Sequence, residues 1–487
     1  MRRISIEPVT RVEGHLKVEV EVSDGRVVRA ESSGLLFRGV ELVLRGRDPR
    51  DAPVITQRVC GVCPQSHGIA ACLALEAAAG MREAVPRNGE LIRGMVMAVQ
   101  HAADHILHFY VLGGLDYFSP VPHAVGLFGP TTEDRRLVDQ ELDRMRRHYV
   151  EALETWRLGQ EVISLAVGRS PHSTGLLPGG VPLVPREDDI LAWRFRIARM
   201  RDFIQRCYLP DAQLLCRRYP EYLQMGSAHG DFLAYGAGVI CDSAPLYAGF
   251  LPSEGELHPL ALERISEGVS RSWYRETEED GEAVPSRLEP MESKAEGYSW
   301  IKAPRYQGRA AEVGPLAQLF VGSQAGQEEF WSQVADLLAG AGADLEGLSS
   351  TMGRNLARAI MAWLMIQWAM QCADSVAPGE PASVAFEVPR EGEGIGLTEA
   401  PRGALLHWVV IRNAKIASYR IISPTTWNAS PRDHAGLPGP MERAVVGLPV
   451  ADDEDLTAVL RTVRSFDPCL ACAVHLVELK KVGGETR

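Results

Sequence analysis

Two cysteine pairs stand near opposite ends of this 487-residue chain, and any fold must account for both. The first pair is Cys60 and Cys63, the second is Cys469 and Cys472, and two residues separate the members of each. Two thiols at this spacing can bind one metal ion from a single turn of backbone, and two such pairs supply four soft sulfur ligands. If both pairs bind one centre, the intervening chain must bring residues 60 and 469 together, so a division into independent domains is not expected.

The spacing of the pairs leaves three kinds of site open: structural zinc, an iron–sulfur cluster and a catalytic soft-metal centre. Four-cysteine zinc sites usually close loops of about 12 to 20 residues in small modules with little core. Here about 400 positions separate the pairs, and 46% of the residues are hydrophobic, so the core is ample. A structural zinc site that closes so long a loop would therefore have no obvious purpose.

Composition excludes some classes of protein. The formal net charge of −12 argues against nucleic acid as the main partner, because phosphate binding needs concentrated positive charge. The chain has nine cysteines without regular spacing, which does not indicate a disulfide framework. No apolar run approaches the roughly 20 residues of a membrane span. The first residues lack a secretory signal, so we expect no direct membrane span. Localisation stays open, because a partner could carry an export signal.

The pattern of apolar and turn residues predicts an α+β fold that is mainly helical. A long central helix bundle is expected, with small β regions near the N-terminus and around residues 404–422. In the helix that we expect from 131 to 168, Thr131 is a plausible N-cap, with Glu133 and Asp134 in the first turn. We expect a loop with one short strand between 374 and 396, and an acidic surface segment at 276–282. The other predicted elements are strands within 4–33, helices at 69–79, 88–112 and 188–217, two helices within 326–374, a hairpin of 404–411 with 416–422, and a short helix after 452.

The residues around the cysteines narrow the choice of site. Arg58 precedes the first pair and His67 follows it, while Asp467 precedes the second pair and His475 follows it. Both signatures resemble those of the large subunit of the nickel–iron hydrogenases. Further stretches are similar to motifs of that family and follow its order: Arg11 to His15, Phe37 to Glu41, Gly46 to Arg50, Asp104 to Tyr110, Pro171 to Gly180, Ala400 to Gly403, and Pro424 to Asn428.

This resemblance implies that all four cysteines bind nickel. Cys60 and Cys469 would be terminal ligands, and Cys63 and Cys472 would bridge the nickel to an iron that also carries carbon monoxide and cyanide. Soft thiolates suit nickel. Molecular hydrogen would then be split heterolytically, or formed, at an open position between the two metals, and the proton would need a base.

The resemblance also implies roles for residues beside the metals. Glu13 matches the proton-transfer glutamate of the family, which follows a terminal cysteine thiolate as proton acceptor. Arg402 matches an arginine over the open site, with Asp104 and Asp467 as the carboxylates that hold it. An arginine is almost always protonated, so as a base it would be unusual.

Pro401 and His67 resemble residues that pack around the centre, and His67 could donate a hydrogen bond to a bridging sulfur. Glu41 and His475 match two protein ligands of a buried magnesium ion in the family. The third would be the backbone carbonyl of Ile421. Magnesium prefers a hard octahedral set of ligands that waters complete.

We expect residues 1–475 to form one unit, and residues 476–487 to be a tail that a maturation protease removes once nickel-insertion proteins have acted. The five other cysteines are not grouped, so electrons must leave through a separate iron–sulfur small subunit. Two alternatives remain: a hydrogen-sensing relative that signals through a kinase, and a structural four-cysteine metal protein. Related quinone-reducing subunits that have lost the cysteines do not match this chain.

Overall fold

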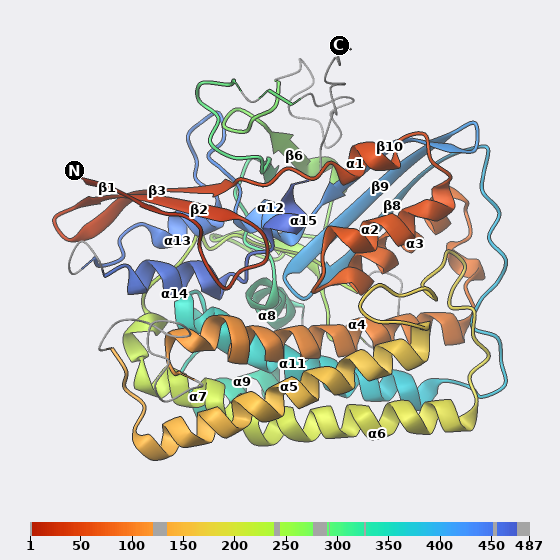
Figure 1. The fold of residues 1–487 in the computed structure, drawn as a ribbon, viewed down its shortest axis with the longest axis horizontal. Coiled ribbons are helices and arrows are strands. Elements are labelled where there is room, and N and C mark those ends of the chain that lie inside the picture. Colours follow the sequence, from red (N-terminus) through yellow and green to blue (C-terminus); the bar gives the residue numbers. More distant parts are fainter. Residues whose placement is uncertain are drawn as a thin grey trace, which may run out of the picture.

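Long helices form one layer of the molecule, and small sheets with short helices form the other (Figure 1). The computed structural model describes residues 2–119, 134–237, 244–275, 290–291, 293–325, 328–450 and 455–474. The predicted acidic segment at 276–282 and the tail at 476–487 lie outside these residues. Within them the predicted α+β class with a central helix bundle is confirmed.

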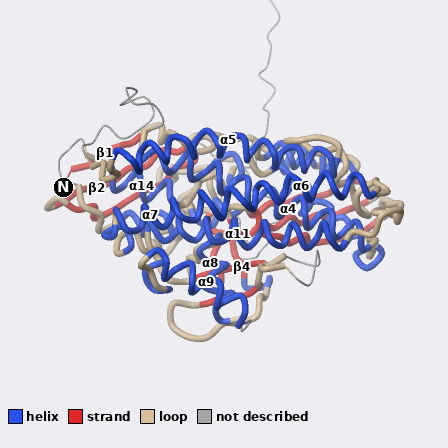
Figure 2. The backbone as a smooth tube through the Cα atoms, turned by 90° about the horizontal axis from the view of Figure 1, so that it is seen from below, coloured by secondary structure: helices blue, strands red, loops and turns tan. Residues whose placement is uncertain are grey.

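The helical layer is built around two long antiparallel neighbours, α4 (Arg87–Leu107) and α11 (Thr351–Ser375). Gly94 of α4 leaves room for the ring of Trp368 on α11, and the side chain of Ser350 caps α11 by accepting a hydrogen bond from the backbone of Gly353. Figure 2 shows further long helices beside this pair. They are α5 (Asp139–Val167), α6 (Glu187–Phe203), α7 (Leu209–Arg218), α8 (Pro315–Gln324) and α9 (Glu328–Ala341).

The predicted helix at 131–168 begins later than expected. Residues 134–138 are not helical, and α5 starts at Asp139, where the Glu141 carboxylate accepts a hydrogen bond from the backbone of Val138. Asp134 and Arg136 instead form ion pairs with Arg461 and Glu221, respectively, which hold this segment away from the helix axis. The predicted cap Thr131 lies outside the described residues.

The N-terminal strands form a three-stranded antiparallel sheet in the order β1 (Arg2–Ile6), β2 (Leu16–Ser23), β3 (Arg26–Gly34). Val18 and Val20 of β2 are buried, as the alternation of apolar and charged residues predicts. The strands confirm the expected β region near the N-terminus. They also position the loop between β1 and β2, which contains Glu13.

The predicted hairpin is confirmed as β9 (Gly403–Arg412) and β10 (Lys415–Ile422). The short strand expected before it is a full third strand, β8 (Glu391–Ala400), which pairs with β9 along its whole length. The sequence did not predict the full length of β8 because glycine, which is unusual in strands, recurs there at alternate positions.

These glycines let helix α3 (Pro64–Ala78) pack directly on β8. A Cβ at Gly394 or Gly396 would meet the backbone carbonyl oxygen of Ala74 or Ala70, respectively. Helix α3 also begins earlier than expected, immediately after Cys63. Strand β8, with glycine at alternate positions, therefore fixes the position of α3. Cys63 immediately precedes this helix, and His67 lies in its first turn.

No described helix is both long enough and apolar enough to span a membrane.

Shorter elements complete the described fold. The shorter elements are α1 (Val40–Leu44), α2 (Ala52–Thr56), α10 (Leu345–Leu348), α12 (Pro424–Asn428), α13 (Pro440–Val445), α14 (Thr457–Ser465), α15 (Leu470–Ala473), and two antiparallel pairs, β4 (Phe232–Tyr235) with β5 (Ala248–Leu251) and β6 (Ile265–Gly268) with β7 (Ala303–Tyr306).

Candidate metal centre

The two ends of the chain meet at Glu13 and Cys469, which form a parallel backbone bridge. The Glu13 amide donates to the Pro468 carbonyl over 3.2 Å, and the Leu470 amide donates to the Glu13 carbonyl over 2.7 Å. Gly14 has φ +87°, and a Cβ there would lie 2.9 Å from the backbone nitrogen of Ala471. In Figure 1, α12 and α15 lie between the N-terminal strands and the β8–β10 sheet.

This bridge brings the two cysteine pairs together. The Sγ atoms of Cys60 and Cys469 are 3.5 Å apart, and those of Cys63 and Cys472 are 4.0 Å apart. All four side chains are buried. The structure joins Cys469 to Cys472 as a disulfide, so binding of a metal by all four residues requires the reduced form of this pair. The arrangement is one buried cluster of sulfur, the donor set that soft metals prefer.

Within the first pair, Cys60 is polarised toward its thiolate form. The backbone amides of Val62 and Cys63 donate to the Sγ of Cys60 over 3.3 and 3.1 Å. Burial acts to raise the pKa of the Cys60 thiol, but a hydrogen bond with Cys63 and the charge of Arg402 outweigh it, and the pKa is lowered. The same hydrogen bond, with burial, raises the pKa of Cys63. A positive charge beside buried thiols therefore favours the metal-binding form.

Arg402 lies in the turn from β8 to β9 and is buried. Its Nε donates to the backbone carbonyl of Asp467 over 2.9 Å, and its Nη2 donates to the Asp467 carboxylate over 3.0 Å. Burial acts to raise the pKa of Asp467, but Arg402 holds it below the usual value. Gly403, which follows, has φ +126° and packs against Gly314. Pro401 is buried beside Arg402.

Asp104 is buried nearby on α4, but no hydrogen bond joins it to Arg402 in the described part of the chain. Burial raises its pKa well above the usual value, which favours the protonated carboxyl. One oxygen of Asp104, one of Asp467 and the Nη1 of Arg402 have no hydrogen-bond partner among the described residues. Such buried polar atoms call for a ligand or water. The residues beside the sulfur cluster therefore offer polar atoms that could contact a bound polar group.

Glu13 lies beside the sulfur cluster. Its Oε2 lies 3.9 Å from the Sγ of Cys469, and its side chain is partly exposed. A carboxylate at this distance can exchange a proton with the thiol after a small movement. Glu13 thus links the buried sulfurs to more accessible parts of the molecule.

His67 faces the other two sulfurs. A ring nitrogen of His67 lies within 4.8 Å of the Sγ atoms of Cys63 and Cys472. The Nδ1 of His67 is 3.0 Å from the Nε2 of His407, whose Nδ1 is 2.9 Å from the hydroxyl of Tyr419. Sequence reasoning did not single out His407 or Tyr419. The one available signal was a histidine in the otherwise apolar strand 404–411.

Charged side chains surround Glu41, one of the residues expected to bind magnesium. A carboxylate oxygen of Glu41 accepts a hydrogen bond from the backbone of Ile421 over 2.8 Å. Lys302 lies 3.9 Å and Arg420 lies 3.5 Å from the Glu41 carboxylate, and both also pair with Glu267. Sequence reasoning missed these three charged residues, since none of them belongs to a matched motif. His475, the other side chain expected to bind magnesium, lies outside the described residues.

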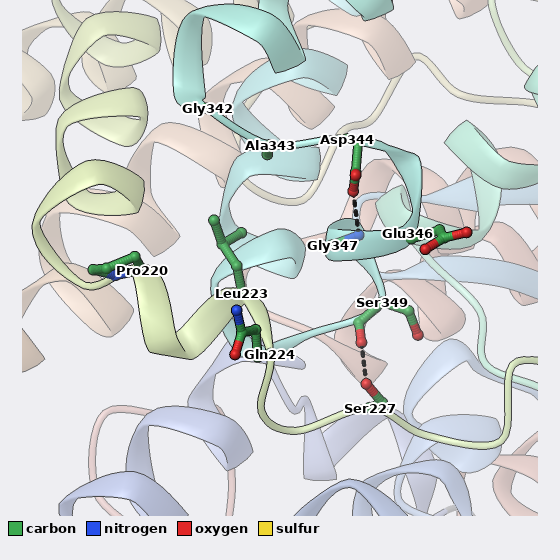
Figure 3. Close-up of a pocket in the computed structure, with 10 residues that line it drawn as sticks. All are labelled: Pro220, Leu223, Gln224, Ser227, Gly342, Ala343, Asp344, Glu346, Gly347 and Ser349. Carbon is green, nitrogen blue, oxygen red and sulfur yellow. Dashed lines mark hydrogen bonds between the residues drawn. The ribbon is translucent and has the colours of Figure 1, made fainter.

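One surface pocket lies elsewhere. It has a volume of about 710 Å³ and lies beside α10, with Leu223 and Gln224 on its other side (Figure 3). Asp344 accepts a hydrogen bond there from the backbone of Gly347 over 2.8 Å, which caps the short helix. None of the predicted site residues lines this pocket, so the chemistry of the chain belongs to the buried sulfur cluster.

Comparisons with known proteins agree with the geometry. The family model described as "Nickel-dependent hydrogenase" matches residues 38–127 and 133–475, and a model described as "HoxL-like" matches residues 3–32. The chain is 37% identical to the periplasmic [NiFeSe] hydrogenase large subunit of Desulfomicrobium baculatum, over 98% of this chain and 95% of the relative. It is 31% identical to the hydrogenase-2 large chain of Escherichia coli strain K12, over 98% of each.

Solved structures give the same result. The reduced Ni-Fe-Se hydrogenase of Desulfovibrio vulgaris Hildenborough superimposes with a TM-score of 0.91 at 37% identity, covering 97% of this chain and 100% of that one. This chain carries cysteine at positions 60, 63, 469 and 472. The converging cysteines and these matches place the chain in the nickel-dependent hydrogenase family, as the large, catalytic subunit of an oxidoreductase that acts on H2.

Proposed function

We propose that the chain cleaves or forms molecular hydrogen heterolytically at a nickel–iron centre that Cys60, Cys63, Cys469 and Cys472 hold. The observation that carries this proposal is the convergence of four buried sulfurs from two distant pairs. The bound centre would supply the redox-active position at which hydrogen reacts. Soft thiolates are the ligands expected for it.

The surroundings support different roles for the cysteines. Cys60 and Cys469 lie on the side of Glu13. This place suits terminal ligands that take part in proton transfer. Cys63 and Cys472 lie on the side of His67. This place suits bridging ligands, because a hydrogen bond from His67 would tune the electron density of their sulfurs. We assign carbon monoxide and cyanide to the iron that this bridging pair would share with nickel.

Proton transfer would begin at the Sγ of Cys469. The thiol proton passes to the Oε2 of Glu13, 3.9 Å away, and from there toward solvent. Arg402 supplies a fixed positive charge over the reacting position, because Asp467 holds its guanidinium by two hydrogen bonds. Asp104 and Pro401 complete this wall of the site. Arg402 is buried, so its charge is weakly screened by solvent.

Electrons would leave through an iron–sulfur small subunit. The relatives are named large subunits, which implies a small-subunit partner. The remaining cysteines, at 72, 207, 216, 241 and 372, are not grouped for a cluster. One relative is named periplasmic. We propose that export, if it occurs, depends on the partner.

Magnesium would bind the carboxylate of Glu41, the carbonyl of Ile421 and the ring of His475, with waters completing the set. The hydrogen bond from Ile421 to Glu41 supports this assignment, because it brings the carboxylate to this strand. We further propose that residues 1–475 are the mature unit and that a protease removes 476–487 after nickel insertion. Mass spectrometry of active protein would detect a retained tail.

An infrared spectrum of the protein, purified with its partner from its native host, tests the proposed centre. We expect one carbonyl band and two cyanide bands that shift under hydrogen. A protein shown to contain nickel and iron but without these bands would refute the assignment of diatomic ligands. The absence of nickel and iron from active protein would refute the centre itself.

A further inference from the structure

We propose that His407 and Tyr419 are positioning residues that hold His67 as a hydrogen-bond donor to the sulfurs of Cys63 and Cys472. This inference rests on the proposed nickel–iron centre and adds two residues to it. They would act through His67 alone, from the β9–β10 hairpin.

The three side chains form one continuous buried chain. His67 is 1%, His407 is 0% and Tyr419 is 4% exposed. The His67–His407 contact measures 3.0 Å between ring nitrogens, and the His407–Tyr419 contact measures 2.9 Å between Nδ1 and the hydroxyl. Both distances are those of hydrogen bonds. The chain therefore runs from the sheet to the first turns of α3.

The direction of the hydrogen bonds follows from Tyr419. A tyrosine hydroxyl ordinarily carries its proton at neutral pH, and this one is buried. Among the described residues, His407 is the one hydrogen-bond partner of this hydroxyl. Leaving a buried donor without an acceptor is costly, so the hydroxyl donates to the Nδ1 of His407.

This choice sets the tautomer of both histidines. When Nδ1 of His407 accepts, its Nε2 carries the proton and donates to the Nδ1 of His67. The proton of neutral His67 must then lie on Nε2, and we assign this nitrogen as the donor to the sulfurs. In the reverse direction, His67 would turn a bare lone pair toward thiolates and the Tyr419 hydroxyl would lose its acceptor. Only the first direction satisfies every group.

The hairpin makes this arrangement rigid. His407 pairs across the sheet with Ile421, and Tyr419 pairs with Val409. Both side chains come from strands whose register is fixed by backbone hydrogen bonds, so the distance between them changes little. A rigid donor chain of this kind maintains the orientation of a group next to a metal ligand.

A hydrogen bond to a thiolate withdraws electron density from the sulfur and from a metal bound to it. Loss of the donor would leave more electron density on the metals. We therefore expect the carbonyl band of a Tyr419→Phe variant to move to lower wavenumber and the midpoint potential of the centre to become more negative. Nickel and iron content should remain unchanged.

The test uses the holoenzyme with its partner subunit. Tyr419→Phe removes one oxygen atom and is compared with Tyr110→Phe, which removes a buried hydroxyl bonded to Asp211 in the helix bundle. Only Tyr419→Phe should shift the band and the potential. His407→Phe should shift both in the same direction, and Tyr419→Phe should add nothing in that background.

The outcomes separate the two proposals. A wild-type protein without diatomic bands refutes the proposed centre. A normal wild-type spectrum with an unchanged Tyr419→Phe spectrum refutes the role of the donor chain. Equal shifts in Tyr419→Phe and Tyr110→Phe would also refute it, because a general effect of lost buried hydroxyls would then explain the result. If His407→Phe does not fold, the comparison of the two tyrosine variants decides alone.

Discussion

The guanidinium of Arg402 donates two hydrogen bonds to Asp467, one to its backbone carbonyl and one to its carboxylate, although 65 positions separate the residues. Asp467 lies two positions before Cys469, and its backbone has φ +52°. The bidentate contact therefore fixes a positive charge relative to the second cysteine pair. A planar guanidinium can make this contact, whereas a lysine ammonium cannot reproduce it.

Replacement of Arg402 by lysine should abolish most activity. We expect hydrogen oxidation to fall by about 100-fold, the size of effect found when one preorganised donor is removed from an active site. Nickel content should remain, because Arg402 is not a ligand. Arg412→Lys at the exposed end of β9 is the control and should retain full activity. Equal activities of the two variants would contradict the proposed role.

Replacement of Glu13 by glutamine should separate proton transfer from metal binding. The amide keeps the size of the side chain but cannot accept a proton, so we expect hydrogen oxidation to fall by about 100-fold or more. The infrared bands of the centre should not move. Glu21→Gln on strand β2 provides the matched control. An active Glu13→Gln variant would show that protons leave by another route.

Replacement of Gly396 by alanine should destabilise the fold. The new Cβ would meet the carbonyl oxygen of Ala70, so α3 must move away from β8. Overpacking of this kind costs about 1–3 kcal/mol. A thermal unfolding curve should show a lower midpoint. Gly268→Ala, where the nearest atom to a new Cβ is 3.8 Å away, should change the midpoint little.

The buried carboxyl of Glu399 should make stability depend on pH. Burial raises its pKa from 4.5 to about 8, while its Oε1 accepts a hydrogen bond from the backbone of Tyr235. Between these values the folded state binds one proton more than the unfolded state. The free energy of unfolding therefore falls as pH rises from 4.5 to 8, by up to about 1.4 kcal/mol per unit.

Glu399→Gln keeps the acceptor for Tyr235 and removes the titration. We expect this variant to lose stability less steeply over that pH range, as measured by urea unfolding at several pH values. Glu391→Gln, an exposed residue of the same strand, should follow the wild type. Parallel curves for Glu399→Gln and the wild type would mean that Glu399 does not hold its proton in the folded state.

Replacement of Glu41 by glutamine should remove magnesium. The amide can still accept the hydrogen bond from Ile421, but it lacks the negative charge that a hard divalent cation requires. Elemental analysis should find less magnesium per chain than in the wild type or in Glu391→Gln. Retention of one magnesium ion per chain in Glu41→Gln would show that this carboxylate is not a ligand.

The two cysteine pairs, together with the resemblance of their flanking residues to a known family, were enough to predict the sulfur site. The two cysteine pairs and their flanking residues indicated a four-thiolate centre, and periodicity indicated the helix bundle and the 404–422 hairpin. These features are local, because a few neighbouring residues carry them. Strand β8 was underestimated because its alternate glycines have no local preference for a strand, and only packing against α3 gives them a purpose.

The tertiary structure alone decided which distant groups touch. Sequence motifs suggested Asp104 and Asp467 as equal partners of Arg402, but the fold joins only Asp467 to it by hydrogen bonds among the described residues. The chain from Tyr419 through His407 to His67 was not visible in the sequence, since it connects a hairpin to a helix 340 positions away. Local residue types determine which chemistry a chain can perform, whereas hydrogen-bond direction, burial and charge depend on neighbours that only folding brings together.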